Sequence, residues 1–255
     1  MEPIEIIILT LFIASGACFG SFINAAALRY AKKESFVKGR SKCPHCGKTL
    51  QWVELIPVLS WLFLLGRCRG CKARISLRYP LAEIACALPA ALCFLRFGFT
   101  WMTPLAFAVC ALLLAISLID AATMEIPNGL VIALIPLAIA AIWARPDVTL
   151  LQRGIGFAAV SLPMLLLALL ITDAFGGGDI KLMAVCGFLL GWQNTLLAFL
   201  IGLIGGGGYG IALIISGKRG KHKHMAFGPY LSFGVAAAML YGDEIISVYL
   251  GLYGF

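Results

Sequence analysis

Residues 101–119 read WMTPLAFAVCALLLAISLI, a run of nineteen residues that contains no charged side chain. An α-helix needs about 20 mostly apolar residues to cross the hydrocarbon core of a bilayer. The chain therefore contains at least one segment built to span a membrane. Seven further stretches have the same character, at 4–28, 81–97, 128–144, 153–172, 180–194, 195–215 and 229–250. The fold class predicted from this pattern is an all-α polytopic membrane protein with about eight transmembrane helices.

The composition agrees with this fold class. Hydrophobic residues make up 61% of the 255 residues, and charged residues make up 13%. Soluble domains usually have about 45–50% apolar residues, and the mean hydropathy here is +0.97. An ordinary soluble globule and a disordered chain are both excluded.

The chain nevertheless carries a net charge of +8, and its basic residues are unevenly distributed. Of the 20 Lys and Arg residues, 12 lie between Arg29 and Arg78, and four more lie in the 218–224 stretch. When the predicted spans are threaded in order, 17 basic residues fall on one side of the bilayer and three on the other. Cytoplasmic loops of membrane proteins are rich in Lys and Arg, so the richer side is predicted to be cytoplasmic. We expect the 218–224 stretch to be a basic loop facing anionic lipid, and we expect no nucleic-acid partner.

This charge pattern divides the chain into three predicted parts. Residues 1–28 are expected to form the first transmembrane helix, and residues 29–80 a small cytoplasmic loop domain. Residues 81–255 are expected to form a helix bundle within the membrane.

Four of the nine cysteines lie in the predicted loop domain, in two Cys-x-x-Cys pairs separated by 21 residues. Each pair can turn its two thiolates toward one tetrahedral zinc ion, and four sulfur ligands leave no position open for catalysis. A structural zinc site is therefore predicted, with two structural disulfides as the alternative. The predicted ligands are Cys43, Cys46, Cys68 and Cys71. Between the pairs, residues 54–65 are apolar but too short to span, and are expected to lie on the membrane surface or to dip into it.

Two acidic residues stand at the ends of predicted spans. Asp120 follows the 101–119 run, and Asp179 follows three consecutive glycines at the start of another span. The threading places both at the cytoplasmic edge. An ionisable group at a span is costly and is by default a candidate functional residue. Two neighbouring carboxyl groups can hydrolyse a peptide, one as general base toward water and the other as a proton donor to the carbonyl.

Other interpretations of these acids stay open from spacing alone. Asp179 fits a helix cap and Asp120 an edge charge. A cation-coupled transporter would use similar acids, although at mid-membrane depth. A zinc-binding membrane scaffold would need neither acid.

The order of motifs resembles that of the bacterial type IV prepilin peptidases, the PilD-like enzymes that act as leader peptidase and N-methyltransferase and have a GxGD-type aspartyl protease motif. The resemblance covers nearly the whole chain and rests on several landmarks. They are the 20–24 stretch (GSFIN), the two cysteine pairs, Arg78-Tyr79-Pro80 with Glu83, Asp120, the 176–179 stretch (GGGD) and the 227–230 stretch (FGPY).

The resemblance implies an aspartic endopeptidase of the bacterial inner membrane with catalytic residues Asp120 and Asp179. It implies zinc on the four cysteines, type IV prepilins and pseudopilins as substrates, and service to a type IV pilus or a type II secretion system. It also implies a second activity, methyl transfer from S-adenosylmethionine to the new N-terminal amine. Gly66 matches a position that the family associates with methylation, and Gly66, Arg78 and Glu83 are the candidate residues for the methyl-donor site. Arg78 as a plain interfacial charge and Glu83 as the partner of a nearby Arg are the alternatives.

Overall fold

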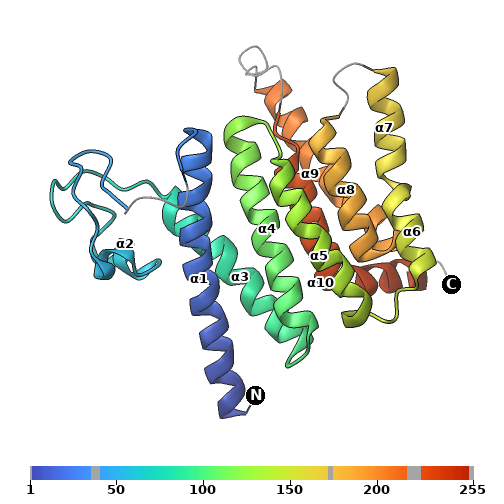
Figure 1. Cartoon of the computed structure of the whole chain (residues 1–255), viewed down its shortest axis with the longest axis horizontal. Helices are drawn as coiled ribbons and strands as arrows, with labels where there is room; N and C mark the ends of the chain where they lie inside the picture. The colour runs from blue at the N-terminus through green and yellow to red at the C-terminus, as the bar shows by residue number, and fades with distance from the viewer. Residues whose placement is uncertain (1, 36–40, 172–174, 217–224, 253–255) are drawn as a thin grey trace. The chain divides into compact units, whose positions relative to one another are not determined.

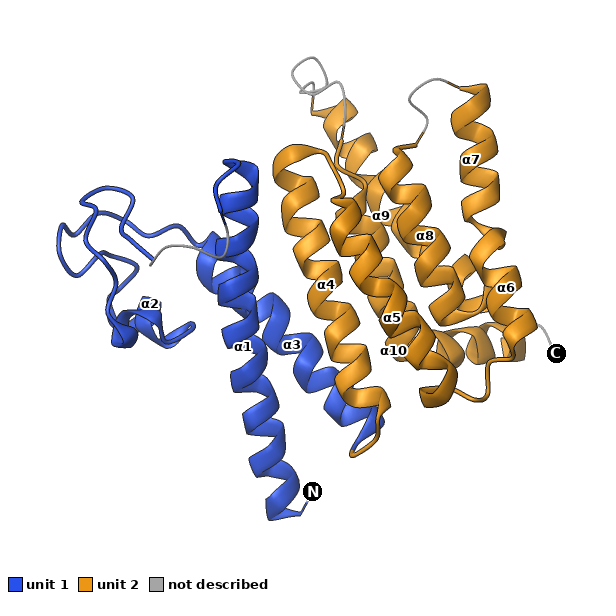
Figure 2. Ribbon diagram, in the orientation of Figure 1, with its two compact units in different colours: residues 1–98 blue, residues 99–255 orange. Residues whose placement is uncertain are grey.

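The structure is a computed structural model of the whole chain, and it describes residues 2–35, 41–171, 175–216 and 225–252. Over these residues it is built from helices, and its only β-structure is two isolated bridges. The helices form two compact units, residues 1–98 and residues 99–255 (Figure 2). The basic stretch 218–224 lies outside the described residues.

Unit 1 contains two long helices, α1 (Pro3–Ala31) and α3 (Arg78–Phe97), joined by the segment with the two cysteine pairs. Within that segment lie the short helices η1 (Trp52–Leu55) and α2 (Leu59–Phe63). Glycines bring α1 and α3 into close contact: a Cβ at Gly16 would stand 2.7 Å from the Cβ of Ala90, and a Cβ at Gly20 would stand 2.8 Å from the Cα of Glu83. Small residues are the usual means of close helix packing in membranes.

Unit 2 is a bundle of helices that alternate in direction (Figure 1). They are α4 (Met102–Thr123), α5 (Asn128–Ala144), α6 (Leu150–Ala159), α7 (Ser161–Leu170), α8 (Gly177–Leu190), α9 (Trp192–Ile215) and α10 (Gly228–Leu252). Because the direction alternates, α4, α7 and α9 end where α5, α8 and α10 begin; we call this the aspartate end of unit 2. At the opposite end, the arginine end, α5 and α8 end and α6 and α9 begin.

Close glycine contacts also hold unit 2 together. Gly156 of α6 and Gly187 of α8 face each other so closely that a Cβ on either would overlap the other's carbonyl oxygen. Gly234 of α10 lies in the same way against the carbonyl oxygen of Ala198 of α9.

Over the described residues each of the eight predicted spans is mostly helical, although 180–194 crosses the break at Gly191 between α8 and α9. The count of eight is not confirmed. Among the described residues, six helical segments are long and apolar enough to cross a membrane: α1, α3, α4, α6 with α7, α9 and α10. The helix α5 has 17 residues and α8 has 14. At 1.5 Å per residue α8 is about 21 Å long, which is shorter than a hydrocarbon core of about 30 Å. A glycine bounds α8 at each end, Gly176 as N-cap and Gly191 with a φ of +80° as C-cap.

The predicted span 153–172 is interrupted at Val160, where α6 ends and α7 begins. Pro163 explains the interruption. A proline has no N–H, and its ring clashes with the carbonyl four residues earlier, here that of Ala159, the last residue of α6.

Candidate active site and cysteine cluster

Asp120 lies in the last turn of α4, at the aspartate end of unit 2. Its side chain is buried, with the residue only 5% exposed, and its Oδ2 accepts a hydrogen bond of 2.8 Å from the backbone N–H of Gly228. Gly228 is the first residue of α10, so this N–H is one of those that a helix start leaves without an internal partner. The start of α10 thereby fixes one oxygen of Asp120.

Asp179 lies in the first turn of α8, at the same end. Its Oδ1 is buried and has no hydrogen-bond partner among the described residues. Gly176 lies against the other oxygen, because a Cβ at this position would stand 3.0 Å from Oδ2. The position in the first turn suits a negative charge near a helix N-terminus, but it does not account for a buried oxygen without a partner.

Several contacts bring the two acids to one place. Gly178, next to Asp179, lies against Ile126 in the turn that follows α4: a Cβ at Gly178 would stand 2.7 Å from the Cβ of Ile126. The ring of Phe175 packs on the ring of Phe227, with 6.0 Å between centroids. The starts of α8 and α10 are thus held against the end of α4, as the predicted topology requires.

Two carboxyl groups, Asp120 buried with one donor and Asp179 half-buried with an unpaired oxygen, have a limited set of uses. They can share a proton, take a proton from water and give one to a carbonyl oxygen. Lys181 of α8, the nearest basic residue along the chain, donates instead to Oδ1 of Asn128 at 3.0 Å.

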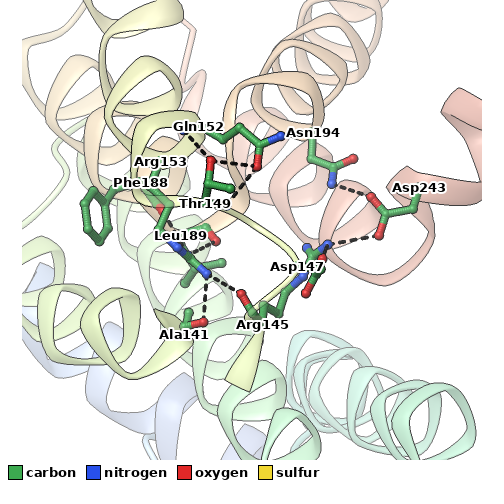
Figure 3. A network of polar contacts seen from close by, with 10 residues as sticks. All are labelled: Ala141, Arg145, Asp147, Thr149, Gln152, Arg153, Phe188, Leu189, Asn194 and Asp243. Carbon is green, nitrogen blue, oxygen red and sulfur yellow. Dashed lines mark hydrogen bonds and ion pairs between the residues drawn. The ribbon is translucent and has the colours of Figure 1, made fainter. Parts of the chain in front are cut away.

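The arginine end of unit 2 has a different polar cluster (Figure 3). Arg153, at the start of α6, is fully buried, and its guanidinium donates to four backbone carbonyls at the ends of α5 and α8. The acceptors are Ala141 and Arg145 at 2.8 Å each, Leu189 at 3.0 Å and Phe188 at 3.2 Å. Arg153 is one of the three basic residues that the predicted topology places on the side opposite the basic loops, and its burial could not be predicted from the sequence.

The four cysteines of the two pairs form one cluster in unit 1. Their sulfur atoms all lie within 4.8 Å of one another, and Cys43 Sγ and Cys71 Sγ are 3.8 Å apart. All four are free thiols, which contradicts the alternative of two disulfides. With zinc–sulfur bonds of about 2.3 Å, sulfur atoms at the corners of a tetrahedron lie about 3.8 Å apart. The cluster is therefore of a size that could hold one metal ion.

The two cysteine pairs have the same backbone geometry. The N–H of Cys43 donates to the carbonyl of Lys48, and the N–H of Cys68 donates to that of Ala73, both at 2.9 Å. A residue with positive φ follows each pair, Gly47 at +70° and Lys72 at +60°. An isolated bridge closes each turn, between Lys42 and Thr49 and between Arg67 and Arg74.

The electrostatics of the first turn favour a thiolate. Backbone N–H groups of Cys46 and His45 lower the pKa of the Cys43 thiol to about 6. The thiolate is the form that binds metals, so the turn fits a metal-ligand role. Nearby, Glu54 accepts hydrogen bonds from the N–H of Gln51 and from Lys48 Nζ, which hold its pKa below the ordinary value.

The three candidate residues for the methyl-donor site lie in unit 1. Gly66 has a φ of +65°, and a Cβ there would stand 2.8 Å from the ring of Trp61. Glu83 is buried on α3 and accepts a hydrogen bond of 2.7 Å from the backbone N–H of Val58. Arg78 is the half-buried first residue of α3. Glu83 therefore ties the segment before Gly66 to α3, with a backbone group as its partner.

Two residues gain importance that sequence analysis did not give them. Gly228 was quoted only as a landmark, although a Gly-Pro pair before an apolar run signals a helix start with free N–H donors. Asn24, also a landmark, is fully buried in α1, and neither end of its amide has a partner within the described part of the chain. Its burial could not be seen in the sequence, because it depends on tertiary packing.

Comparison with known proteins agrees with the two structural units. Residues 14–97 match the bacterial peptidase A24 N-terminal domain, and residues 107–211 match the type IV leader peptidase family. A prepilin leader peptidase/N-methyltransferase from Bacillus subtilis is 37% identical over 242 residues, which cover 95% of this chain and 98% of the relative. The chain belongs to the type IV leader peptidase family.

Other members of the leader peptidase family are similar over most of the chain. Proteins of the same description are 35% identical in Stutzerimonas stutzeri, over 82% of this chain and 74% of the relative, and in Pseudomonas aeruginosa, over 87% and 78%. No solved structure matches the chain. The family resemblance inferred from the motifs is thus confirmed.

Proposed function

We propose that this chain is a bifunctional membrane enzyme that removes the leader peptide of type IV prepilins and pseudopilins and then N-methylates the new N-terminal residue. The observation that carries the proposal is the meeting of Asp120 and Asp179 at one end of unit 2, in a member of the leader peptidase family. Its relatives are named prepilin leader peptidase/N-methyltransferase.

In the proposed cleavage, the two aspartates act on a water molecule and the scissile peptide. Asp120, held by the N–H of Gly228, takes a proton from water while the water oxygen attacks the carbonyl carbon. Asp179, in its protonated form, donates from the otherwise unpaired Oδ1 to the carbonyl oxygen. Collapse of the tetrahedral intermediate breaks the C–N bond: one hydroxyl of the intermediate returns its proton to Asp179, and the leaving nitrogen takes the proton held by Asp120. No acyl-enzyme forms.

The proposed second step uses the amine released by cleavage. The amine attacks the methyl carbon of S-adenosylmethionine, the sulfonium sulfur leaves as S-adenosylhomocysteine, and the amine loses a proton. Gly66, Arg78 and Glu83 are the proposed residues on the methyl-donor side. The support is that two of these residues contact one short segment of unit 1. Glu83 accepts a hydrogen bond from Val58, and Gly66 lies against the ring of Trp61.

We further propose that the cysteine cluster holds a structural zinc ion. Cys43, Cys46, Cys68 and Cys71 would supply four thiolates, which close the coordination sphere and tie the two turns together. The support is the size of the cluster and the shared backbone geometry of the turns. Bound zinc would supply folding energy to the segment between the turns and no step of the reaction.

The proposed setting is the bacterial inner membrane, with the aspartate end of unit 2 and the cysteine turns facing the cytoplasm. Support comes from the concentration of basic residues between Arg29 and Arg78. A prepilin has a basic leader before an apolar helix, so its scissile bond would lie at the cytoplasmic edge of the membrane. The same proposal includes substrates that serve a type IV pilus or a type II secretion system. It also includes the division of the chain into a first transmembrane helix up to residue 28, a cytoplasmic loop domain up to residue 80 and a membrane bundle after it.

No observation favours a cation-coupled transporter. Such a protein would place its acids at mid-membrane depth, whereas Asp120 is in the last turn of α4 and Asp179 in the first turn of α8.

A single experiment tests both activities. The purified chain in phospholipid vesicles is incubated with a prepilin-like peptide, and the products are identified by mass spectrometry. We expect loss of the leader without any cofactor, and addition of one methyl group to the new N-terminus only when S-adenosylmethionine is present. An intact peptide with correctly inserted protein would contradict the peptidase proposal.

A further inference from the structure

An exposed apolar surface lies between the two cysteine turns, and neither the proposed cleavage nor the proposed metal site uses it. Phe63 is 83% exposed, Leu65 84% and Trp52 78%. Leu59 and Leu62 are also more than half exposed. We call residues 52–65 the apolar segment. Several large apolar side chains exposed within one short segment mark a site of interaction with a membrane or another molecule.

The apolar segment is amphipathic. Within α2, Leu59, Leu62 and Phe63 are spaced i, i+3 and i+4 and so lie on one face of the helix. The side chain of Trp61 is turned to the protein, where its Nε1 donates to the carbonyl of Ile75 at 3.3 Å and its ring lies over Gly66. One face is therefore anchored within unit 1, and the other is presented outward.

The structure fixes the level of the apolar segment along a membrane helix. The N–H of Val58, directly before α2, donates to Glu83 on α3. Glu83 is the sixth residue of α3, so it lies about 7.5 Å along the helix from Arg78 at 1.5 Å per residue. The helix α3 is long and apolar enough to cross the bilayer. Val58, and with it the start of α2, thus lies beside the second turn of α3, near the end of a helix that is long and apolar enough to span a membrane.

The backbone bends sharply on both sides of α2. Val58 has a φ of +59° and Leu65 a φ of +50°. A β-branched residue with positive φ is a genuine outlier, and such strain persists only where the surroundings enforce it. Here the hydrogen bonds of Val58 and Trp61 hold the bent backbone in place. The apolar face of α2 then points away from the rest of unit 1.

The surroundings of the apolar segment are positively charged. Residues 41–77 contain six basic residues and one acidic residue, Glu54, which is paired with Lys48 at 3.0 Å. The second cysteine turn carries four of the six, all exposed: Arg67, Arg69, Lys72 and Arg74. An apolar face with flanking Lys and Arg is the composition of segments that lie in the interface of an anionic bilayer.

We propose that the apolar segment is an interfacial membrane anchor that seats the cysteine turns on an anionic phospholipid surface. Trp52, Leu62, Phe63 and Leu65 enter the boundary between headgroups and acyl chains, and the basic residues of the second turn contact lipid phosphates. The anchor sets the height of Gly66 and the cysteine cluster above the bilayer. It does not depend on the proposed catalysis.

The test uses tryptophan fluorescence in vesicles of phosphatidylcholine and phosphatidylglycerol whose acyl chains carry bromine, a quencher that acts only at short range. In a full-length variant that keeps Trp61 and has the other four tryptophans replaced by phenylalanine, a reporter is introduced by Phe63→Trp, and the emission of the parent variant with Trp61 alone is subtracted. The matched control is His45→Trp, at the exposed tip of the first cysteine turn. We expect brominated lipid to remove at least about half of the Phe63→Trp emission and little of the control emission, because only position 63 reaches the acyl boundary.

Equal, weak quenching at both positions would overturn the proposal. A second result would also overturn the proposal. In that result brominated lipid leaves the Phe63→Trp emission unchanged, whereas a prepilin-like peptide, or a higher protein density in the vesicle, protects this emission from a water-soluble quencher. Those results would assign the surface to the substrate or to a second copy of the chain.

A second measurement needs no substitution. The natural chain is placed in vesicles that contain an anionic lipid with a photoreactive acyl chain, and crosslinked residues are mapped by mass spectrometry. We expect crosslinks within residues 52–65 as well as in α1 and α3. Crosslinks confined to the long helices would contradict the anchor, and peptide cleavage measured on the same vesicles shows separately whether the proposed function holds.

Discussion

The two ends of unit 2 differ in how their charged side chains are hydrogen-bonded. At the arginine end, Arg153 is fully buried and its terminal nitrogens donate to four carbonyls at the ends of α5 and α8. At the aspartate end, two acids lie close together, and Asp179 keeps a buried oxygen without a partner among the described residues. Each terminal nitrogen of Arg153 thus has acceptors, although Arg153 Nε and Asn194 Oδ1 have no partner among the described residues. What differs is that the aspartate end keeps its unpaired oxygen on a carboxyl group, which can accept or donate a proton.

Helix polarity explains why each end accepts its charges. Carbonyls at helix C-termini carry partial negative charge, and N–H groups at helix N-termini carry partial positive charge. Arg153 therefore finds acceptors where α5 and α8 end, and Asp120 finds a donor where α10 begins. Arg145 extends the arginine end with ion pairs to Asp147 at 3.0 Å and Asp243 at 2.9 Å. Within the described residues, Asp120 has one donor, the N–H of Gly228, and in the proposed mechanism the remaining carboxyl oxygens bind water and a peptide.

The largest expected effect is the loss of either acid at the aspartate end. Asp120→Asn and Asp179→Asn should each lower the rate of leader removal by about 10³-fold or more, because an amide can neither accept a proton from water nor donate one as an acid. The rate is measured by mass spectrometry with a prepilin-like peptide. Asp147→Asn is the matched control, an acid of the arginine end that is 62% exposed, and it should keep the natural rate within about twofold. Normal cleavage by Asp179→Asn would remove this residue from the active site.

At the arginine end the effect should fall on stability. Arg153→Met leaves four buried carbonyl acceptors without their donor, which should lower the free energy of unfolding by about 3 kcal/mol. Thermal unfolding of the purified protein in detergent measures the loss. The rate of cleavage per folded molecule, determined below the unfolding transition, should stay within a few-fold of the natural rate. If Arg153→Met lost cleavage but kept the natural free energy of unfolding, Arg153 would serve the reaction and not the stability of the fold.

A smaller effect is expected from a methyl group placed against Asp120. In Gly228→Ala, the new Cβ would stand 2.7 Å from Asp120 Oδ2 and so displace the carboxylate. A displacement of about 1 Å in an active site can cost about 10²-fold in rate, and we expect cleavage to fall by about that factor. Gly207→Ala on α9 is the control, since a Cβ there meets nothing within 4 Å. Equal rates for the two variants would show that the N–H of Gly228 does not position Asp120.

The smallest effect concerns a glycine of unit 1 with a similar steric constraint. Gly66→Ala adds a Cβ 2.8 Å from the Trp61 ring at a φ of +65°, and strain of this kind costs about 1–3 kcal/mol. We expect methylation to fall by about tenfold and cleavage to change little, measured on the same peptide. Gly47→Ala has the same type of backbone strain at +70° but no neighbour within 4 Å, so it controls for the strain. Equal loss of both activities would show that Gly66 only supports folding.

Sequence patterns predicted the local features and missed those that depend on packing. The two cysteine pairs could be predicted as one cluster because each turn is defined by a few neighbouring residues. The helical segments could be predicted because an apolar run of about 20 residues has few other uses. The count of eight spans is not confirmed, because α8 has only 14 residues and ends at Gly191, and hydropathy does not register where a helix stops.

The roles of Arg153 and Gly228 could not be predicted in the same way. The acceptors of Arg153 lie 8 to 36 residues from it, at the ends of two other helices, and converge only in the folded bundle. Gly228 and Asp120 are separated by 108 residues. Asp120 and Asp179 could be predicted to lie at the same end of the bundle. When helices alternate in direction, the order of the spans sets the end at which each acid lies.

The most direct test of the central claim, that the two acids act as one catalytic unit, is a double-mutant cycle. Leader removal is measured for Asp120→Asn, Asp179→Asn and the double variant in the same vesicles, with the same prepilin-like peptide. Residues that act together are strongly non-additive, so we predict that the double variant is no slower than the slower single variant. A double variant whose loss equals the product of the two single losses would contradict the claim, because the acids would then act independently.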